Sequence, residues 1–482
     1  MNVNILIAFA AYFFILLLIG VIFHKKQKTS TDFIIGNRSL NFWVVALSAH
    51  ASDMSSWLFM AFPMTIFTLG VPQSWTALGL IVGMFLNWHY VAPKLRRMTE
   101  QYDCTTLSTF FEKRFGDTSG ILRVVSALMM IVFLTHYLSS GFIAMGFMFE
   151  SIFGIEYMIG LSVATIVIVA YTFIGGYTTV AWVDLFQGIF LLVMIILVPA
   201  IAFTKIEGWS SIVTTAQQKG IPLSPLGDLS TDSVVTMFSL ALGWGLGYFG
   251  MPHIITKFMG IKNVSEMSKS KWLGMSWQVI ALGTATFIGM VGIAYFPNGL
   301  EKPEMVFVEM VKDLFHPLGA GFILCGILAA NLSTMDSQIL VCASVLSEDL
   351  YKHFGKEKAS QATLLTISRC GLFLIAGIAL VLAFDRSKTI LDTVFYSWSG
   401  LGSSFGPLVL VSLFSSKANK YGAIAGVLVG GVTVMVWPQV NPLVTMYKIS
   451  PMIPGFFCSL LAIYGVSWLT RQSVSTELKV ES

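Results

Sequence analysis

The stretch that decides the fold reads Ser48-Ala49-His50-Ala51-Ser52-Asp53-Met54-Ser55-Ser56-Trp57, in the middle of an otherwise apolar run over residues 40–69. A second interrupted run contains Gly243-Trp244-Gly245-Leu246-Gly247-Tyr248-Phe249-Gly250-Met251-Pro252. Breaks of this kind free backbone N–H and C=O groups at membrane depth. Freed backbone is tolerated there only when it is buried in protein or lines a cavity. The two breaks therefore predict an internal binding site.

The composition explains why the apolar runs are read as membrane spans. The chain has 482 residues, of which 55% are apolar and only 11% are charged, with a mean hydropathy of +0.78. A typical soluble domain carries about 25% charged residues. This composition excludes a secreted, cytosolic or nucleic-acid-binding protein and makes the lipid bilayer the main partner. We read the net charge of +4 as a sign of topology.

Counting apolar runs of about 20 residues predicts an all-α, multi-pass membrane protein with 13 transmembrane helices. The first run is expected to be a retained span, because its lysines follow it and no cleavage site ends it. The predicted spans cover residues 3–23, 40–69, 73–93, 121–149, 157–175, 180–204, 233–252, 272–296, 317–347, 361–384, 389–415, 421–438 and 450–470.

The loops set the expected orientation. Of the 29 Lys and Arg residues, 22 fall in one set of alternating loops and 7 in the other. Cytoplasmic loops retain positive charge, so the N-terminus is expected outside and the C-terminus inside. Short helices are expected in loops 94–120 and 205–232.

The order of the breaks predicts one transport domain over residues 1–482, built on a five-plus-five inverted repeat. Its parts are an extra span at 3–23, the repeats 40–204 and 233–415, two final spans within 421–470, and a polar cytoplasmic tail at 471–482.

Acidic residues inside spans are costly and are functional candidates by default. Asp53, Asp184 and Asp336 fall at membrane depth or its edge. Asp53 could instead cap the broken helix or pair with a base such as Arg38. Two histidines at membrane depth, His50 and His136, could be packing residues or proton carriers.

Adjacent hydroxyls at Ser333 and Thr334 suggest a cation site. A sodium ion needs several neutral oxygens. Carbonyls freed near Ala51 and Met54, with the two hydroxyls and the Ala330 carbonyl, would supply about five. The alternative is that both hydroxyls bond back to the preceding turn, and a site requires the first break to lie opposite them.

The second break offers an aromatic face. Trp244 and Tyr248 lie one turn apart and share a side wherever the helix persists. Such a face suits the apolar or cationic part of a small solute. The alternative is close helix packing through Gly243 and Gly247, which have the GxxxG spacing.

Taken together, these residues resemble the sodium/solute symporter family, and most closely its bacterial sodium/proline symporters. The resemblance implies a LeuT-like broken-helix fold, with one span before the ten-span inverted repeat and two after it. Besides the two breaks, the motifs that carry it are Ile35-Ile-Gly-Asn-Arg-Ser-Leu, Tyr171-Thr-Phe-Ile-Gly-Gly176 with Trp182 and Asp184, Pro252-His253, Leu328-Ala-Ala330 with Ser333-Thr334, Ser347-Glu-Asp-Leu-Tyr351 and Gly422-Ala-Ile-Ala-Gly426.

The resemblance also implies roles for individual residues. Asp53 matches an acid needed for sodium dependence, and Arg38 matches a base near the cytoplasmic gate. The sodium ligands implied are Ala51, Met54, Ala330, Ser333 and Thr334. The substrate pocket implied is Ser55, Trp57, Tyr137, Trp244, Tyr248 and Pro252.

Three residues depart from the proline-transporter pattern, namely Ser56, Met251 and Asp336. Some relatives form a second sodium site from an acid like Asp184 with hydroxyls like those of Ser333 and Ser337. We therefore hypothesise a second cation or proton site at Asp184 and Asp336, with Ser337.

The expected function is sodium-driven uptake of a small amino acid, L-proline above all, across a bacterial plasma membrane, without an obligate protein partner. Symport of another amino acid, a sugar acid or a vitamin stays open, as does a sensor or channel without coupled transport. A membrane enzyme is disfavoured, because no nucleophile–base pair or metal-ligand cluster appears in the sequence.

Overall fold

The computed structural model describes residues 3–22, 30–354, 359–387 and 389–477. Within these ranges the regular structure is helical, apart from one isolated bridge between Leu40 and Ile261. Part of the charge pattern behind the predicted orientation lies outside the described residues. These positions are Lys25, Lys26, Lys28, Lys356, Lys358, Lys388 and the tail residues 478–482.

The helices agree closely with the predicted apolar runs. They are α1 (Val3–Ile22), α2 (Ser30–Ile35), α3 (Phe42–Ala51), α4 (Ala61–Leu69), α5 (Trp75–Leu86), α6 (Ala92–Gln101), α7 (Leu107–Phe115), α8 (Ile121–Phe153), α9 (Tyr157–Gly175), α10 (Tyr177–Phe203), α11 (Gly208–Lys219), α12 (Thr231–Gly245), α13 (Pro252–Met259), α14 (Met267–Tyr295), α15 (Val306–Leu314), α16 (Pro317–Ser344), α17 (Lys352–Phe354), α18 (Gln361–Leu382), α19 (Ile390–Phe414), α20 (Lys420–Val444) and α21 (Met452–Glu477).

Nine helices in the described part of the chain are long and apolar enough to cross a membrane. Shorter apolar helices at Phe42–Ala51, Ser56–Leu69 and Tyr157–Val169 accompany them. The all-α membrane class is therefore confirmed, whereas the count of 13 crossings stays a prediction.

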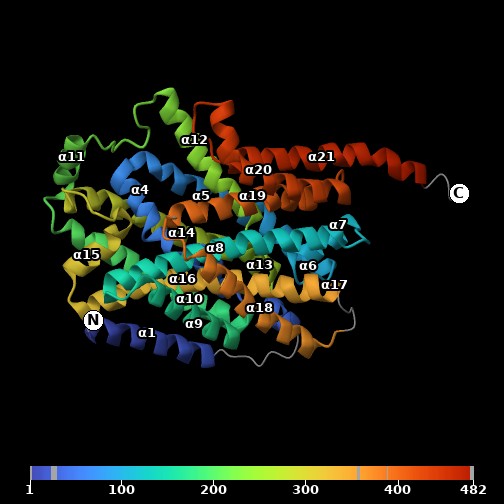
Figure 1. The fold of residues 1–482 in the computed structure, drawn as a ribbon, viewed down its shortest axis with the longest axis horizontal. Coiled ribbons are helices and arrows are strands. Elements are labelled where there is room, and N and C mark those ends of the chain that lie inside the picture. Colours follow the sequence, from blue (N-terminus) through green and yellow to red (C-terminus); the bar gives the residue numbers. More distant parts are fainter. Residues whose placement is uncertain (1–2, 23–29, 355–358, 388, 478–482) are drawn as a thin grey trace.

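The two ends of the bundle carry different short helices (Figure 1). The α11 and α15 helices lie at the end where α1 begins, and α6, α7 and α17 lie at the opposite end, toward which α21 runs. The short helices expected in loops 94–120 and 205–232 are present as α6, α7 and α11, whereas α15 was not predicted. The start of α1 and the end of α21 therefore lie at opposite ends of the bundle, which agrees with the predicted odd number of crossings.

Both predicted breaks are present. The α3 helix ends at Ala51, and a short 3-10 turn, η2 (Ser56–Leu58), precedes α4. The α12 helix passes into η5 (Leu246–Gly250), and Met251 is extended, with φ −85° and ψ 101°, before α13 begins. Non-helical backbone thus lies where polar and glycine residues interrupt the apolar runs.

The α16 helix lies at the centre of the bundle and is buried over most of its length. It packs against α1, α8, α10 and α18. A helix enclosed in this way can carry polar side chains, because neighbouring helices rather than lipid supply their partners. The polar run that begins at Asn331 is therefore placed where it can meet the first break.

Glu304 provides a pH test away from the membrane core. It lies in η7 (Pro303–Met305), where burial, assisted by the charge of Asp392, raises its pKa to about 7. The folded state then binds a proton more tightly than the unfolded chain, so stability falls as pH rises from about 4.5 through 7. We expect Glu304→Gln to flatten this fall in thermal unfolding between pH 5 and 8. If wild type and variant lose stability equally over this pH range, Glu304 is not the group that causes the loss.

Candidate transport site

The first break lies directly opposite the hydroxyl pair on α16. Ser333 Oγ donates across the interface to the Ala51 carbonyl at 2.8 Å, and it also lies 3.1 Å from the Ala330 carbonyl. Thr334 Oγ1 lies 3.0 Å from the same Ala330 oxygen. Four of the five predicted sodium ligands therefore converge, and Met54 follows in the buried stretch that ends the break.

The same hydroxyls also bond back within α16, as the alternative reading expected. Ser333 Oγ reaches the Ala329 carbonyl at 2.8 Å. Back-bonding alone would leave the hydroxyls inside their own helix. The contact to Ala51 shows that the required opposite partner is present, so the donor set fits a monovalent cation with neutral oxygen ligands.

An acidic cluster lies one turn from this set. Asp184 Oδ2 accepts hydrogen bonds from Ser48 Oγ at 2.7 Å and from Ser52 Oγ at 3.2 Å. Ser52 Oγ is 2.9 Å from Ser337 Oγ, and Ser337 Oγ is 3.3 Å from Asp336 Oδ1. The structure thus brings together all three residues of the hypothesised second cation site.

The two breaks are joined by Asp53 and Tyr248. The Tyr248 hydroxyl donates to Asp53 Oδ2, and Gln278 Nε2 donates to the Tyr248 hydroxyl at 2.8 Å. Asn87 Nδ2 holds the Tyr248 carbonyl at 2.9 Å. The described partner of Asp53 is therefore a residue of the second break, and not Arg38.

Aromatic rings bridge the breaks beside this link. Trp57 stacks on Trp244, with ring centroids 5.5 Å apart and planes at 29°. Trp398 on α19 donates its indole N–H to the Trp244 carbonyl at 2.9 Å and packs edge-on against Tyr248. A side chain at Gly247 would collide with the Trp398 indole. The glycines of this break therefore serve close packing as well as the interruption.

Tyr137, Ser55 and Pro252 are all buried beside the two breaks. The Tyr137 ring packs edge-on against His253, with centroids 5.8 Å apart. Both ring nitrogens of His253 are buried and have no hydrogen-bond partner among the described residues. A buried polar atom without a partner carries a desolvation penalty, and a polar ligand or a water molecule that hydrogen-bonds to it removes that penalty.

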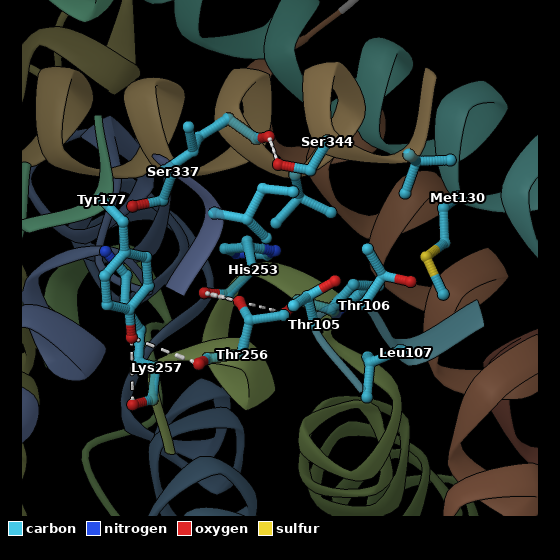
Figure 2. A pocket seen from close by; sticks show the side chains of 15 residues that line it. Thr105, Thr106, Leu107, Met130, Tyr177, His253, Thr256, Lys257, Ser337 and Ser344 are labelled. Carbon is cyan, nitrogen blue, oxygen red and sulfur yellow. Dashed lines mark hydrogen bonds between the residues drawn. The ribbon is translucent and has the colours of Figure 1, made fainter. Parts of the chain in front are cut away.

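A small cavity of about 20 Å³ adjoins His253 (Figure 2). Tyr177 and Lys257 line one side of it, and Ser337 and Ser344 reach in from α16. The volume suffices for about one water molecule. The cavity extends to Thr106, next to α7, so it lies on the side of the site that faces the α6–α7 end.

Arg38 lies away from the ion ligands. Its guanidinium donates to the carbonyls of Thr99 at 3.0 Å and Cys104 at 2.9 Å, and it reaches the Met259 carbonyl at 3.4 Å. Burial, with the nearby charge of Arg96, lowers its pKa from the usual value. Arg38 thus fastens α13 to the α6–α7 segment at one end of the bundle.

Both histidines at membrane depth make packing contacts. His50 accepts a hydrogen bond from the Trp88 indole N–H at 3.1 Å and stacks on that ring. His136 packs edge-on against Tyr396. Both arrangements are typical of packing residues.

The structure adds three residues that the sequence reading did not assign. Asn331 accepts a hydrogen bond from the Ser56 N–H and donates to the Gly141 carbonyl, which fixes the first break to α16 and α8. Lys257 is buried against Asp184, although it was counted with the cytoplasmic loops, and Trp398 covers the second break. Of these, only Lys257 had a sequence signal, as a charge inside the apolar stretch 252–259.

The fold and this site define a membrane transporter with two broken helices at its centre. A family model described as the sodium:solute symporter family matches residues 33–430. The chain is 42% identical to the high-affinity proline transporter PutP of Bacillus subtilis (strain 168), with 95% of this chain and 96% of that protein covered. It is 40% identical to the osmoregulated proline transporter OpuE of the same organism, with 100% and 98% covered.

This chain belongs to the sodium:solute symporter family. A sodium/proline symporter of Staphylococcus aureus is 39% identical, with 97% of this chain and 93% of that protein covered. These relatives are transporters, which agrees with the prediction that the chain is not an enzyme.

Solved structures confirm the broken-helix symporter fold. A Na⁺-coupled sialic acid symporter in a substrate-bound, outward-open state matches with a TM-score of 0.81 at 18% identity, covering 97% of this chain and 98% of that chain. MhsT in complex with L-phenylalanine matches with a TM-score of 0.54 at 15% identity, covering 89% of this chain and 98% of that chain. The predicted LeuT-like fold class is therefore correct.

Proposed function

We propose that this protein couples the inward sodium gradient to uptake of a small amino acid, L-proline, across a bacterial plasma membrane. The curated relatives named above support this substrate, because each is a proline transporter covered over nearly its whole length. In this proposal the end that carries α11 and α15 faces outward, the C-terminus is cytoplasmic, and residues 1–482 work as one transport domain without an obligate protein partner.

The observation that carries the proposal is the contact of Ser333 Oγ with the Ala51 carbonyl. A sodium ion held by Ala51, Met54, Ala330, Ser333 and Thr334 would replace that contact and tie α16 to the end of α3. The same break continues into Asp53, whose carboxylate accepts from Tyr248 in the other break. Sodium binding would thereby order both breaks at once.

The substrate is proposed to bind between the breaks. Freed N–H groups and the Ser55 hydroxyl would meet its carboxylate, while the ring would pack on Trp57 and Trp244, with Tyr137, Tyr248 and Pro252 completing the pocket. Since sodium and substrate favour the same arrangement, each raises the affinity of the other by the same factor. Arg38, which holds α13 to the α6–α7 segment, would regulate opening at the cytoplasmic end.

A second cation position is proposed at Asp184, Asp336 and Ser337. These side chains form one continuous hydrogen-bonded cluster with Ser48 and Ser52. Two carboxyls buried this close together are stable only when a cation or a proton compensates their charge.

Uptake by the purified full-length chain in proteoliposomes tests the proposed function. Radiolabelled proline should accumulate under an inward sodium gradient, and it should not accumulate when potassium replaces sodium. Competition by other amino acids, a sugar acid and a vitamin ranks the alternative substrates. Uptake that does not depend on sodium contradicts the proposed coupling. Sodium-driven uptake of another solute in place of proline contradicts the proposed substrate.

A further inference from the structure

Lys257 brings a positive charge into the acidic cluster from the opposite repeat. It lies on α13, where its side chain is only 2% exposed, and its Nζ is 2.9 Å from Asp184 Oδ2. Lysine is almost never fully buried unless it is paired with an opposite charge. The Tyr177 hydroxyl donates to the Lys257 carbonyl at 3.2 Å, which further fixes this end of α13 to α10.

The ammonium lies where a free cation would bind. The same Asp184 oxygen accepts from Ser48 Oγ and Ser52 Oγ, so Nζ completes a shell with two hydroxyls around one carboxylate oxygen. Ser337, which the second-site hypothesis names as a ligand, is bonded to Ser52 and lines the small cavity beside Lys257 (Figure 2).

The cluster is also close to the proposed sodium ligands. Two contacts join α3 and α16 in succession: Ala51 with Ser333, and Ser52 with Ser337. Ser333 and Ser337 are one helical turn apart, so their Cβ atoms are separated by about 5–6 Å. Two mobile cations at this spacing would repel each other in a medium of low dielectric constant.

We propose that the Lys257 ammonium is itself the second cation, tethered to the chain, so that each transport cycle carries a single sodium ion. This inference rests on the proposed function of sodium-coupled uptake. A tethered charge is not released to the cytoplasm, and it therefore adds no gradient energy to transport. A free ion in the same position would be released and would raise the attainable accumulation of substrate.

The cluster holds two carboxyl groups and one ammonium, so Lys257 compensates only one of the two carboxyls. Asp184 Oδ1 and Asp336 Oδ2 are buried and have no hydrogen-bond partner among the described residues. Asp336 lies about one turn from Ser333, so a sodium ion bound there favours the ionised form of this carboxyl and is in turn attracted by it. Asp336→Asn should therefore raise the sodium concentration for half-maximal uptake severalfold while the stoichiometry stays at one, and an unchanged sodium affinity contradicts this step.

The test is the number of sodium ions carried per proline, obtained from the membrane potential at which net proline flux stops in proteoliposomes. Wild type should give one. Lys257→Gln leaves Asp184 unpaired and should admit a second sodium ion, which gives a value of two and a steeper sodium activation curve. Lys257→Arg keeps the positive charge, so this variant should still carry one sodium ion per proline.

Two further variants serve as controls. Asp184→Asn combined with Lys257→Gln removes both charges and should return the value to one. Lys271→Gln removes another buried lysine, which lies on α14 and contacts His89 at 3.1 Å, and it should leave the value at one. If a Lys257 variant binds but does not transport, sodium-dependent protection against thermal unfolding gives the number of bound ions.

The possible failures can be told apart. A wild-type value of two, or a value of one in Lys257→Gln by both measurements, overturns the tethered-cation inference while sodium-coupled uptake stands. An absence of sodium-dependent proline uptake in wild type overturns the proposed function instead.

Discussion

Replacing Ser333 and Thr334 together by alanine should raise the sodium concentration for half-maximal uptake by about tenfold or more. Each hydroxyl is a proposed ligand that lies within 3.1 Å of the Ala330 carbonyl, and a loss of about 1.4 kcal/mol of binding free energy corresponds to a factor of ten. The maximal rate at saturating sodium should change much less, because alanine is a good helix former and leaves α16 intact. Sodium titration of proline uptake measures both quantities.

The matched control is Thr172→Ala on α9. Thr172 is buried and its hydroxyl bonds back to the Ile168 carbonyl at 2.8 Å, so the substitution removes a similar hydroxyl away from the proposed ion ligands. Its sodium dependence should match wild type. An unaltered sodium dependence in the Ser333/Thr334 double variant rejects the assignment of the sodium site.

The second large effect is expected from Tyr248→Phe. This change removes the donor to Asp53 and the acceptor of Gln278, and it leaves a buried carboxylate oxygen unpaired. Hydrogen bonds to charged groups contribute about 1.5–3 kcal/mol, so kcat/KM for proline should fall by about tenfold to a hundredfold. Sodium affinity should fall with it, because the same link joins the two breaks.

A double-mutant cycle tells loss of the Tyr248–Asp53 hydrogen bond from a general loss of stability in the variant. If Tyr248 acts through Asp53, Tyr248→Phe should cost much less in an Asp53→Asn background than alone. Tyr157→Phe serves as the control, since that hydroxyl donates to the neutral Ala383 carbonyl at 2.9 Å, far along the chain from both breaks. Additive effects of the Tyr248 and Asp53 changes contradict the coupling of the two breaks.

Much of the fold could be predicted because membrane spans are encoded locally. The run at 121–149 became α8 (Ile121–Phe153), and the run at 3–23 became α1 (Val3–Ile22), since a stretch of apolar residues needs no distant partner to form a helix in lipid. The breaks were equally local, because Asp53 and the glycines around Tyr248 interrupt the apolar pattern where they stand. The helix α15 was not predicted, because its short amphipathic stretch lies in a polar loop.

Partners across the bundle could not be predicted in this way. Asn331 and Trp398 lie in helices whose apolar pattern gives no sign of what they face, and they contact the breaks only because α16 and α19 pack there. Lys257 was misplaced for the same reason. A lysine near a helix end is normally a topology signal, and its burial depends on an aspartate 73 positions away.

The sequence by itself determined the membrane class and the two interrupted helices, and it supplied the residue types of the proposed sodium site, because each depends on composition or spacing within one segment. Only the tertiary structure decided that Ser333 faces Ala51, that Asp53 pairs with Tyr248, and that Lys257 neutralises Asp184. The physical reason is burial. A polar group removed from water must find its partner inside the protein, and that partner is set by which helices pack together.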